Sequence, residues 1–166
     1  MAFRSWVFCG TATLLSPCWQ SETGTESKCL QLEGTSPTFS DVPTPKVVSP
    51  REIAASLTEL WSPRVIAEVD DAYIKVAKIQ GSFVWHSHEG EDEMFLVLKG
   101  RMRIEMEGGP VELGEGGLFV VPKGVRHNTV AEEECHLMLI ERKTTLHTGD
   151  VVAEKTRTIA EQLRPV

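Results

Sequence analysis

The chain has 166 residues, of which 41% are hydrophobic, and this suits one domain with a substantial apolar core. Its 17 basic and 24 acidic side chains give a formal net charge of −7, which argues against a nucleic-acid partner or an anionic membrane surface. The sequence has no apolar run of about 18 residues, so we expect no membrane-spanning helix.

Residues 1–46 differ in composition from the rest of the chain. No acidic residue precedes Glu22, and Ser, Thr, Gly and Pro then accumulate without periodicity. This composition predicts a leader or a disordered tail. The apolar stretch behind Arg4 is compatible with a secretory leader and the acid-poor start with an organelle transit peptide, but an unprocessed flexible tail fits as well. We therefore expect a cytoplasmic protein, or an organelle-targeted or secreted one if residues 1–21 act as a leader.

A single folded domain is predicted over residues 47–157, and it begins with a helix. Ser49, Pro50 and Glu52 provide an N-cap serine, a proline at the first helical position and the glutamate of a capping box. The helix is expected to end at about Leu60. Its apolar residues at positions 53, 57 and 60 form a stripe, which predicts packing on the outside of a barrel or against a partner subunit.

Short strands separated by glycine-rich turns fill the rest of this domain. The expected strands cover residues 65–69, 73–79, 83–88, 93–99, 101–107, 111–113, 118–121, 126–130 and 135–142. This order predicts an all-β fold, an antiparallel barrel or jelly roll, followed by a C-terminal tail over 158–166 with a short helix at 158–163. Residues 94–98 are apolar on both strand faces, which predicts an outer covering by a partner subunit or by the N-terminal helix.

The stretch from Gly81 to Gly100 has the outline of a metal site. His86 and His88 are one residue apart, so an extended strand would point both side chains to one face, within reach of one ion. Residues 89–92 are polar and predict a turn, after which Glu93 begins the next strand and returns toward the same face. The sequence thus predicts three ligands in one place.

A fourth candidate ligand, His127, follows a second glycine-rich stretch. The two stretches read G-x(4)-H-x-H-x(4)-E-x(6)-G and G-x(5)-P-x-G-x(2)-H, and together they resemble the two signature motifs of the cupin superfamily. Cupins usually have five residues before the first histidine and an asparagine where this chain has Ala131, but neither difference removes a ligand. The resemblance implies a cupin double-stranded β-helix, a jelly-roll barrel, with metal bound by His86, His88, Glu93 and His127. Residues 93–156 resemble small single-domain bacterial cupins that are often labelled mannose-6-phosphate isomerase-like.

The donor set suggests the kind of ion. Three imidazoles and one carboxylate suit one divalent transition metal, Fe, Mn, Ni, Cu or Zn, whereas Ca²⁺ and Mg²⁺ prefer shells of oxygen alone. If that ion is octahedral, four protein ligands leave two positions for water, dioxygen or a chelating substrate. The residues themselves do not choose among the transition metals.

Two hypotheses about function remain open at this stage. The resemblance implies a homodimeric, metal-dependent enzyme, a dioxygenase or an isomerase or lyase, acting on a small polar molecule inside the barrel. The alternative is a non-catalytic module that binds a small molecule or a metal.

No catalytic residue is identified, and the candidates by residue type alone are Tyr73, Lys75, Arg103 and His136. His136 and His147 fit no motif. An apolar pocket would favour binding or oxidation of an apolar ligand, and inward Arg, Lys or Tyr would favour sugar or acid chemistry.

Overall fold

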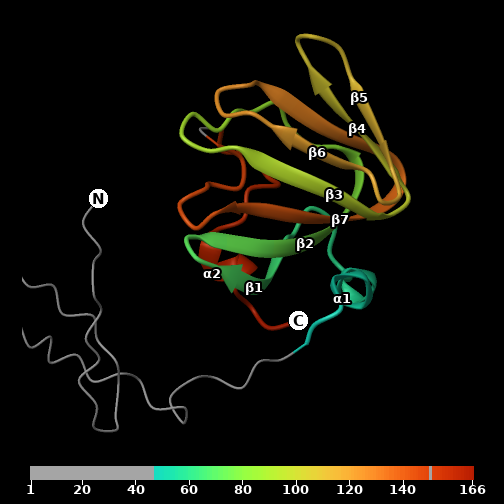
Figure 1. Cartoon of the computed structure of the whole chain (residues 1–166), viewed down its shortest axis with the longest axis vertical. Helices are drawn as coiled ribbons and strands as arrows, with labels where there is room; N and C mark the ends of the chain where they lie inside the picture. The colour runs from blue at the N-terminus through green and yellow to red at the C-terminus, as the bar shows by residue number, and fades with distance from the viewer. Residues whose placement is uncertain (1–46, 150) are drawn as a thin grey trace, which may run out of the picture. The chain divides into compact units, whose positions relative to one another are not determined.

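The structure is a computed structural model that describes residues 47–149 and 151–166. The predictions for residues 1–46 therefore lie outside the described residues. The elements in chain order are α1 (Pro50–Ser56), β1 (Arg64–Val69), β2 (Ala72–Ser82), β3 (Glu93–Lys99), β4 (Arg101–Met106), β5 (Val111–Gly114), β6 (Leu118–Val121), β7 (His127–Arg142) and α2 (Ile159–Gln162) (Figure 1). Within the described ranges, no helix combines the length and the apolar character needed to cross a membrane.

The strands form an antiparallel sheet organised around β7. This strand is 16 residues long, and it pairs with β4 near its start and with β2 and β3 along the rest of its length. The outer strands β1 and β6 extend the sheet from β2 and β3, while β5 pairs with β4 as a hairpin. In Figure 1 the β4–β5 hairpin lies at one end and β1–β2 at the other, with β3, β6 and β7 between them. The all-β jelly-roll fold predicted from the sequence is confirmed.

Two strand predictions need correction. Residues 126–130 and 135–142 were expected to be separate strands, but the chain stays extended between them as β7. The expected strand 83–88 is not formed, and only His86 makes an isolated bridge, to His127. The amide of Phe83 donates to the carbonyl of Thr129, and His86 and His127 exchange main-chain hydrogen bonds. The chain therefore advances three residues, from 83 to 86, opposite two residues of β7, from 129 to 127. This extra residue interrupts the ladder.

The N-terminal helix is shorter than expected. Ser49 caps it as predicted, but the backbone turns extended at Leu57, with φ −62° and ψ 136°. Leu60 then forms a parallel bridge with Lys78, so this segment follows the sheet edge instead of continuing the helix. At the other end of the chain, Thr158 forms a capping box at the start of the short helix α2, within the predicted range.

The apolar residues fall into an inner and an outer cluster. The inner cluster fills the barrel and includes Phe95, Ile104 and Leu137, each no more than 3% exposed. The outer cluster joins α1 to the outside of the sheet through contacts of Ala54 and Leu57 with Val76, and it extends to Leu98 and Met138. The chain's own helix therefore covers part of the outer face of β3.

We expect the turn between β3 and β4 to require glycine. Gly100 has φ +87°, and a Cβ atom there would lie 2.9 Å from the carbonyl oxygen of Glu134. Gly124 has φ +75°, but a Cβ atom there would make only an ordinary contact, 4.0 Å from Oε2 of Glu89. Replacement of either residue with valine should lower the free energy of unfolding by about 1 to 3 kcal/mol, with Gly100 at the upper end because a clash adds to the backbone strain. Urea unfolding beside an exposed control, Glu132→Ala, tests this; equal stability of all variants would contradict it.

Candidate metal centre

Four buried side chains converge at one end of the barrel. Glu93 is the first residue of β3, His127 is the first residue of β7, and His86 and His88 lie in the extended segment between β2 and β3. Their candidate ligand atoms all lie within 4.8 Å of one another. The structure thus brings together the four residues that the sequence predicted as ligands, in a cluster that could hold a metal ion. Metal binding itself remains a prediction.

Backbone contacts between the two motifs hold this cluster. His86 and His127 exchange main-chain hydrogen bonds of 3.0 and 2.9 Å. The amide of Gly124 donates to the carbonyl of His88 at 2.8 Å, so the Pro-x-Gly turn of the second motif is tied to the first. Main-chain hydrogen bonds therefore hold His86, His88 and His127 close to one another.

Hydrogen bonds to the backbone orient two of the imidazoles. Nδ1 of His86 lies 2.9 Å from the carbonyl oxygen of Val84, and Nδ1 of His127 lies 3.0 Å from that of Val125. A carbonyl can only accept, so each Nδ1 carries the proton in the neutral ring. Nε2 of His86 then offers a lone pair, whereas Nε2 of His127 faces Oε2 of Glu93. Histidines that bind metals in proteins are commonly fixed in this way.

The distances within the cluster fit a single ion. Oε2 of Glu93 lies 3.1 Å from Nε2 of His127 and 3.3 Å from Nε2 of His88. Neighbouring ligands of an octahedral ion with bonds of about 2.1 Å are about 3.0 Å apart. In addition, Nε2 of His86 and Nε2 of His88 are buried without a hydrogen-bond partner among the described residues. A cation would satisfy these lone pairs, so the residues present fit a bound transition metal.

The pKa values of the cluster shift in different directions. Burial lowers the pKa of His86 to about 4. Burial acts the same way on His88, but contact with Glu93 and the charges of nearby glutamates outweigh it and raise the pKa of His88 above 6.5. For Glu93, burial opposes ionisation, yet the contacts with His127 and His88 prevail and hold its pKa well below the usual range. The carboxylate is therefore charged at neutral pH.

Metal affinity should fall with acidification, and the fall should begin above pH 6.5. Protons and metal compete for the same imidazole nitrogen. Because its pKa is raised, His88 is the first of these histidines to become protonated, and so to oppose metal binding, as pH decreases. His86 should add no proton competition until about pH 4. We expect about a tenfold loss of zinc affinity per pH unit below the pKa of His88. Titration against a competing chelator between pH 5 and 8 measures this, and a flat profile would contradict it.

An internal cavity lies beside the cluster. It measures about 30 Å³, room for about one or two water molecules, and both His86 and Glu93 line it. Most of its walls are apolar and include Phe83, Phe95 and Leu137, and its other polar lining residues are Thr129, Glu141 and His147. Glu141 and His147 were not identified from the sequence, although alternation along β7 places Glu141 on the same inward face as Leu137 and Leu139.

The residues that were candidates by type alone take different positions. Lys75 is completely buried in the barrel, where its Nζ lies 3.2 Å from Oε1 of Glu141. Arg103 pairs instead with Glu105 and Glu132 at the surface. His136 lies on the outer face of β7 and contacts Glu134, and Tyr73 lies beside Lys143. The side chain of Lys75 thus reaches Glu141, which lines the cavity, and Tyr73 lies opposite Glu141 in the β2–β7 ladder.

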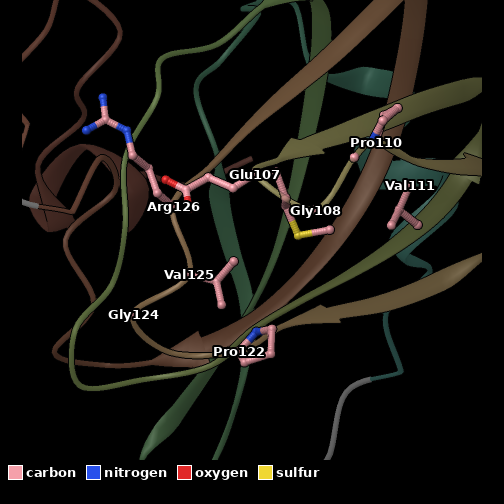
Figure 2. Close-up of a pocket in the computed structure, with 10 residues that line it drawn as sticks. Glu107, Gly108, Pro110, Val111, Pro122, Gly124, Val125 and Arg126 are labelled. Atoms are coloured by element: carbon pink, nitrogen blue, oxygen red, sulfur yellow. The ribbon is translucent and has the colours of Figure 1, made fainter.

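A separate cleft of about 560 Å³ opens between the β4–β5 turn and the loop before β7 (Figure 2). Glu107, Gly108 and Pro110 form one side, and Val125 and Arg126 form the other (Figure 2). None of the four candidate ligands lines this cleft. Of these two spaces, the internal cavity adjoins the candidate metal centre.

Comparisons with known proteins identify the family. Residues 72–141 match the family model of the cupin domain. A cupin-2 domain containing protein from Shewanella frigidimarina NCIMB 400 is 40% identical, and the match covers 58% of this chain and 95% of that one with a TM-score of 0.57. Protein NMB1881 from Neisseria meningitidis is 28% identical, with coverage of 59% and 100% and a TM-score of 0.54.

One bacterial protein is also similar to this chain over part of its length. The uncharacterized protein YdbB from Bacillus subtilis strain 168 is 29% identical over 92 residues, which are 55% of this chain and 81% of that protein. The fold, the two motifs and these matches have one explanation. This chain belongs to the cupin superfamily.

Proposed function

We propose that the protein is a metal-dependent enzyme, a dioxygenase that acts on a small molecule inside the barrel. The observation that carries this proposal is the contact between cluster and cavity, since His86 and Glu93 belong to both. A molecule in the cavity would therefore lie against an ion held by His86, His88, Glu93 and His127. The ion would be one divalent transition metal, Fe, Mn, Ni, Cu or Zn.

The largely apolar walls favour oxygen chemistry over sugar chemistry. When bound, such an ion polarises oxygen ligands and can hold dioxygen next to a substrate. In the dioxygenase reaction proposed here both oxygen atoms would enter the substrate, and the substrate itself would supply the electrons, so no further reductant would be needed. Phe83, Phe95 and Leu137 would exclude water from this space, while His86 and Glu93 would face the substrate.

A second candidate, an isomerase or lyase, is favoured by the polar residues of the cavity. Glu141 and His147 both carry groups that can exchange protons, and proton transfer is what such reactions require. A non-catalytic binding module is the third outcome. The superfamily itself does not decide among these, because one fold carries many functions.

The experiment is metal analysis followed by oxygen uptake. The purified protein should carry about one transition-metal ion per chain, and the protein reconstituted separately with each of the five metals should be assayed for oxygen consumption with a panel of small hydroxylated and carbonyl compounds. Uptake with at least one metal supports a dioxygenase. Product formation without oxygen uptake supports the isomerase or lyase. Full metal content without turnover on any compound supports the binding module, and metal-free protein after reconstitution contradicts the whole proposal.

We also propose that the chain forms a homodimer through the outer face of β3 and β6. Leu118 and Val120 on β6 are 57% and 41% exposed, and they pair across the strands with Leu96 and Met94. Large apolar side chains grouped on one sheet face are typical of a surface that a partner covers. Light scattering should give a dimer mass for the wild type and a monomer mass for Leu118→Glu. A monomeric wild type would contradict the proposal.

A further inference from the structure

Two polar side chains face the cavity without being candidate metal ligands. Glu141 lies near the end of β7, and His147 lies in the segment that follows this strand. They line the same space of about 30 Å³ as His86 and Glu93. Because the other walls are apolar except for Thr129, these two residues control which polar group can enter.

One carboxylate oxygen of Glu141 lacks a hydrogen-bond donor. Its side chain is 2% exposed, and Oε1 lies 3.2 Å from Nζ of Lys75. The second oxygen, Oε2, is buried and has no hydrogen-bond partner among the described residues. Burial raises the pKa of Glu141 to about 7, so at pH 8 the group is mainly a carboxylate. A buried carboxylate oxygen without a donor is costly, so a ligand that donates a hydrogen bond to Oε2 would be favoured there.

His147 offers a donor of fixed orientation. The backbone N–H of Arg157 donates to Nδ1 of His147 at 3.1 Å. Burial, together with the charge of Lys75, lowers the pKa of His147 to about 4, so the ring is neutral at neutral pH. With Nδ1 accepting, the single proton of the neutral ring resides on Nε2. The ring also packs against Phe83, at 5.1 Å between centroids, and Phe83 in turn contacts His86.

We propose that Glu141 and His147 recognise a hydroxyl group of the substrate, with Oε2 of Glu141 accepting its hydrogen bond and Nε2–H of His147 donating to its oxygen. The inference rests on the proposed function and deepens it, because it specifies a small substrate that carries a hydroxyl group. A space for about one or two water-sized groups takes the hydroxyl-bearing end of a small substrate. The apolar walls leave few partners for additional hydroxyls, which argues against a polyhydroxylated sugar.

Glycolate and acetate are the smallest pair of probes that differ only in one hydroxyl group. Calorimetric titration of the zinc-loaded protein should show tighter binding of glycolate. In His147→Phe, which keeps the ring and removes the donor, this preference should fall about tenfold, the effect of about one hydrogen bond. Zinc content and acetate affinity should stay unchanged, whereas His147→Gln, which retains an N–H donor, should recover part of the preference. Glycolate can chelate zinc in every variant. The test is therefore the change, between wild type and variant, in the ratio of glycolate affinity to acetate affinity.

Glu141→Gln provides the matching test of the acceptor and should also reduce the preference. An unchanged preference in both His147→Phe and Glu141→Gln would overturn the proposal. A second readout does not depend on metal: long-range ¹H–¹⁵N NMR of the histidine side chains should show His147 protonated at Nε2. Protonation at Nδ1 would overturn the role of His147. A wild type that fails to retain zinc would contradict the proposed function, and the tautomer in the metal-free protein would still decide this point.

Discussion

Alanine at any one of the four candidate ligands is expected to lower metal affinity by more than about a hundredfold. Loss of a partner that only orients a ligand typically costs 10- to 100-fold, and loss of the ligand itself removes a bond to the ion. The cluster of His86, His88, Glu93 and His127 is buried, so water replaces a lost ligand poorly. Elemental analysis after reconstitution with zinc measures the effect.

Glu93→Gln is a sharper test than the alanine variants, because it removes the charge of the side chain and preserves its size. Oε2 of Glu93 lies within 3.3 Å of two imidazole nitrogens, so loss of its charge should weaken metal binding with little change in packing. His136→Ala is the control, since this histidine contacts Glu134 on the outer face of β7. His147→Ala should also retain metal. Equal metal content in Glu93→Gln and wild type would show that the carboxylate is not a ligand.

The clustering of the four candidate ligands could be predicted from the sequence because its signals are local. The bounds of β3 and β6 match the predicted ranges 93–99 and 118–121, where apolar runs end at turn residues. The spacing of His86, His88 and Glu93 required only a turn between two extended segments. His127 followed from its position after the Pro-x-Gly turn, which hydrogen-bonds to the backbone of His88.

Other features depended on contacts that are distant in the sequence. The acidic, exposed residues 132–134 resemble a turn, but β7 remains extended because its two ends pair with different strands. His147 lies outside both motifs, and its orientation depends on the backbone of Arg157, ten residues away. Lys75 was a catalytic candidate by residue type alone, and its burial is explained by its partner Glu141, which is distant in the sequence. The alternation of side chains along β7 places Glu141 on the inward face, but a single bulge in the strand would have turned it to the outward face.

Lys75→Met is expected to lower the free energy of unfolding by about 3 to 5 kcal/mol at pH 8, because removal of one partner leaves a buried charge uncompensated. Lys75 and Glu141 have side-chain exposures of 0% and 2%. Burial raises the pKa of Glu141 to about 7 even though Lys75 lowers it, so without Lys75 this pKa should rise further. When folding raises the pKa of a carboxyl group, the folded protein becomes less stable as pH increases above the pKa that the group has in the unfolded chain. The loss in Lys75→Met should therefore be smaller at pH 5 than at pH 8.

The double variant Lys75→Met with Glu141→Leu should recover most of the lost stability, since well-packed apolar residues can replace a buried ion pair at little cost. Arg142→Met is the matched control, because Arg142 pairs with Asp71 at the surface, where their side chains are 57% and 70% exposed. Its effect should be far smaller, as exposed ion pairs contribute little. Urea unfolding of all four proteins at pH 5 and pH 8, at equal metal content, separates these effects. A loss in Lys75→Met that is small at both pH values would show that the buried pair is not what stabilises this end of the barrel.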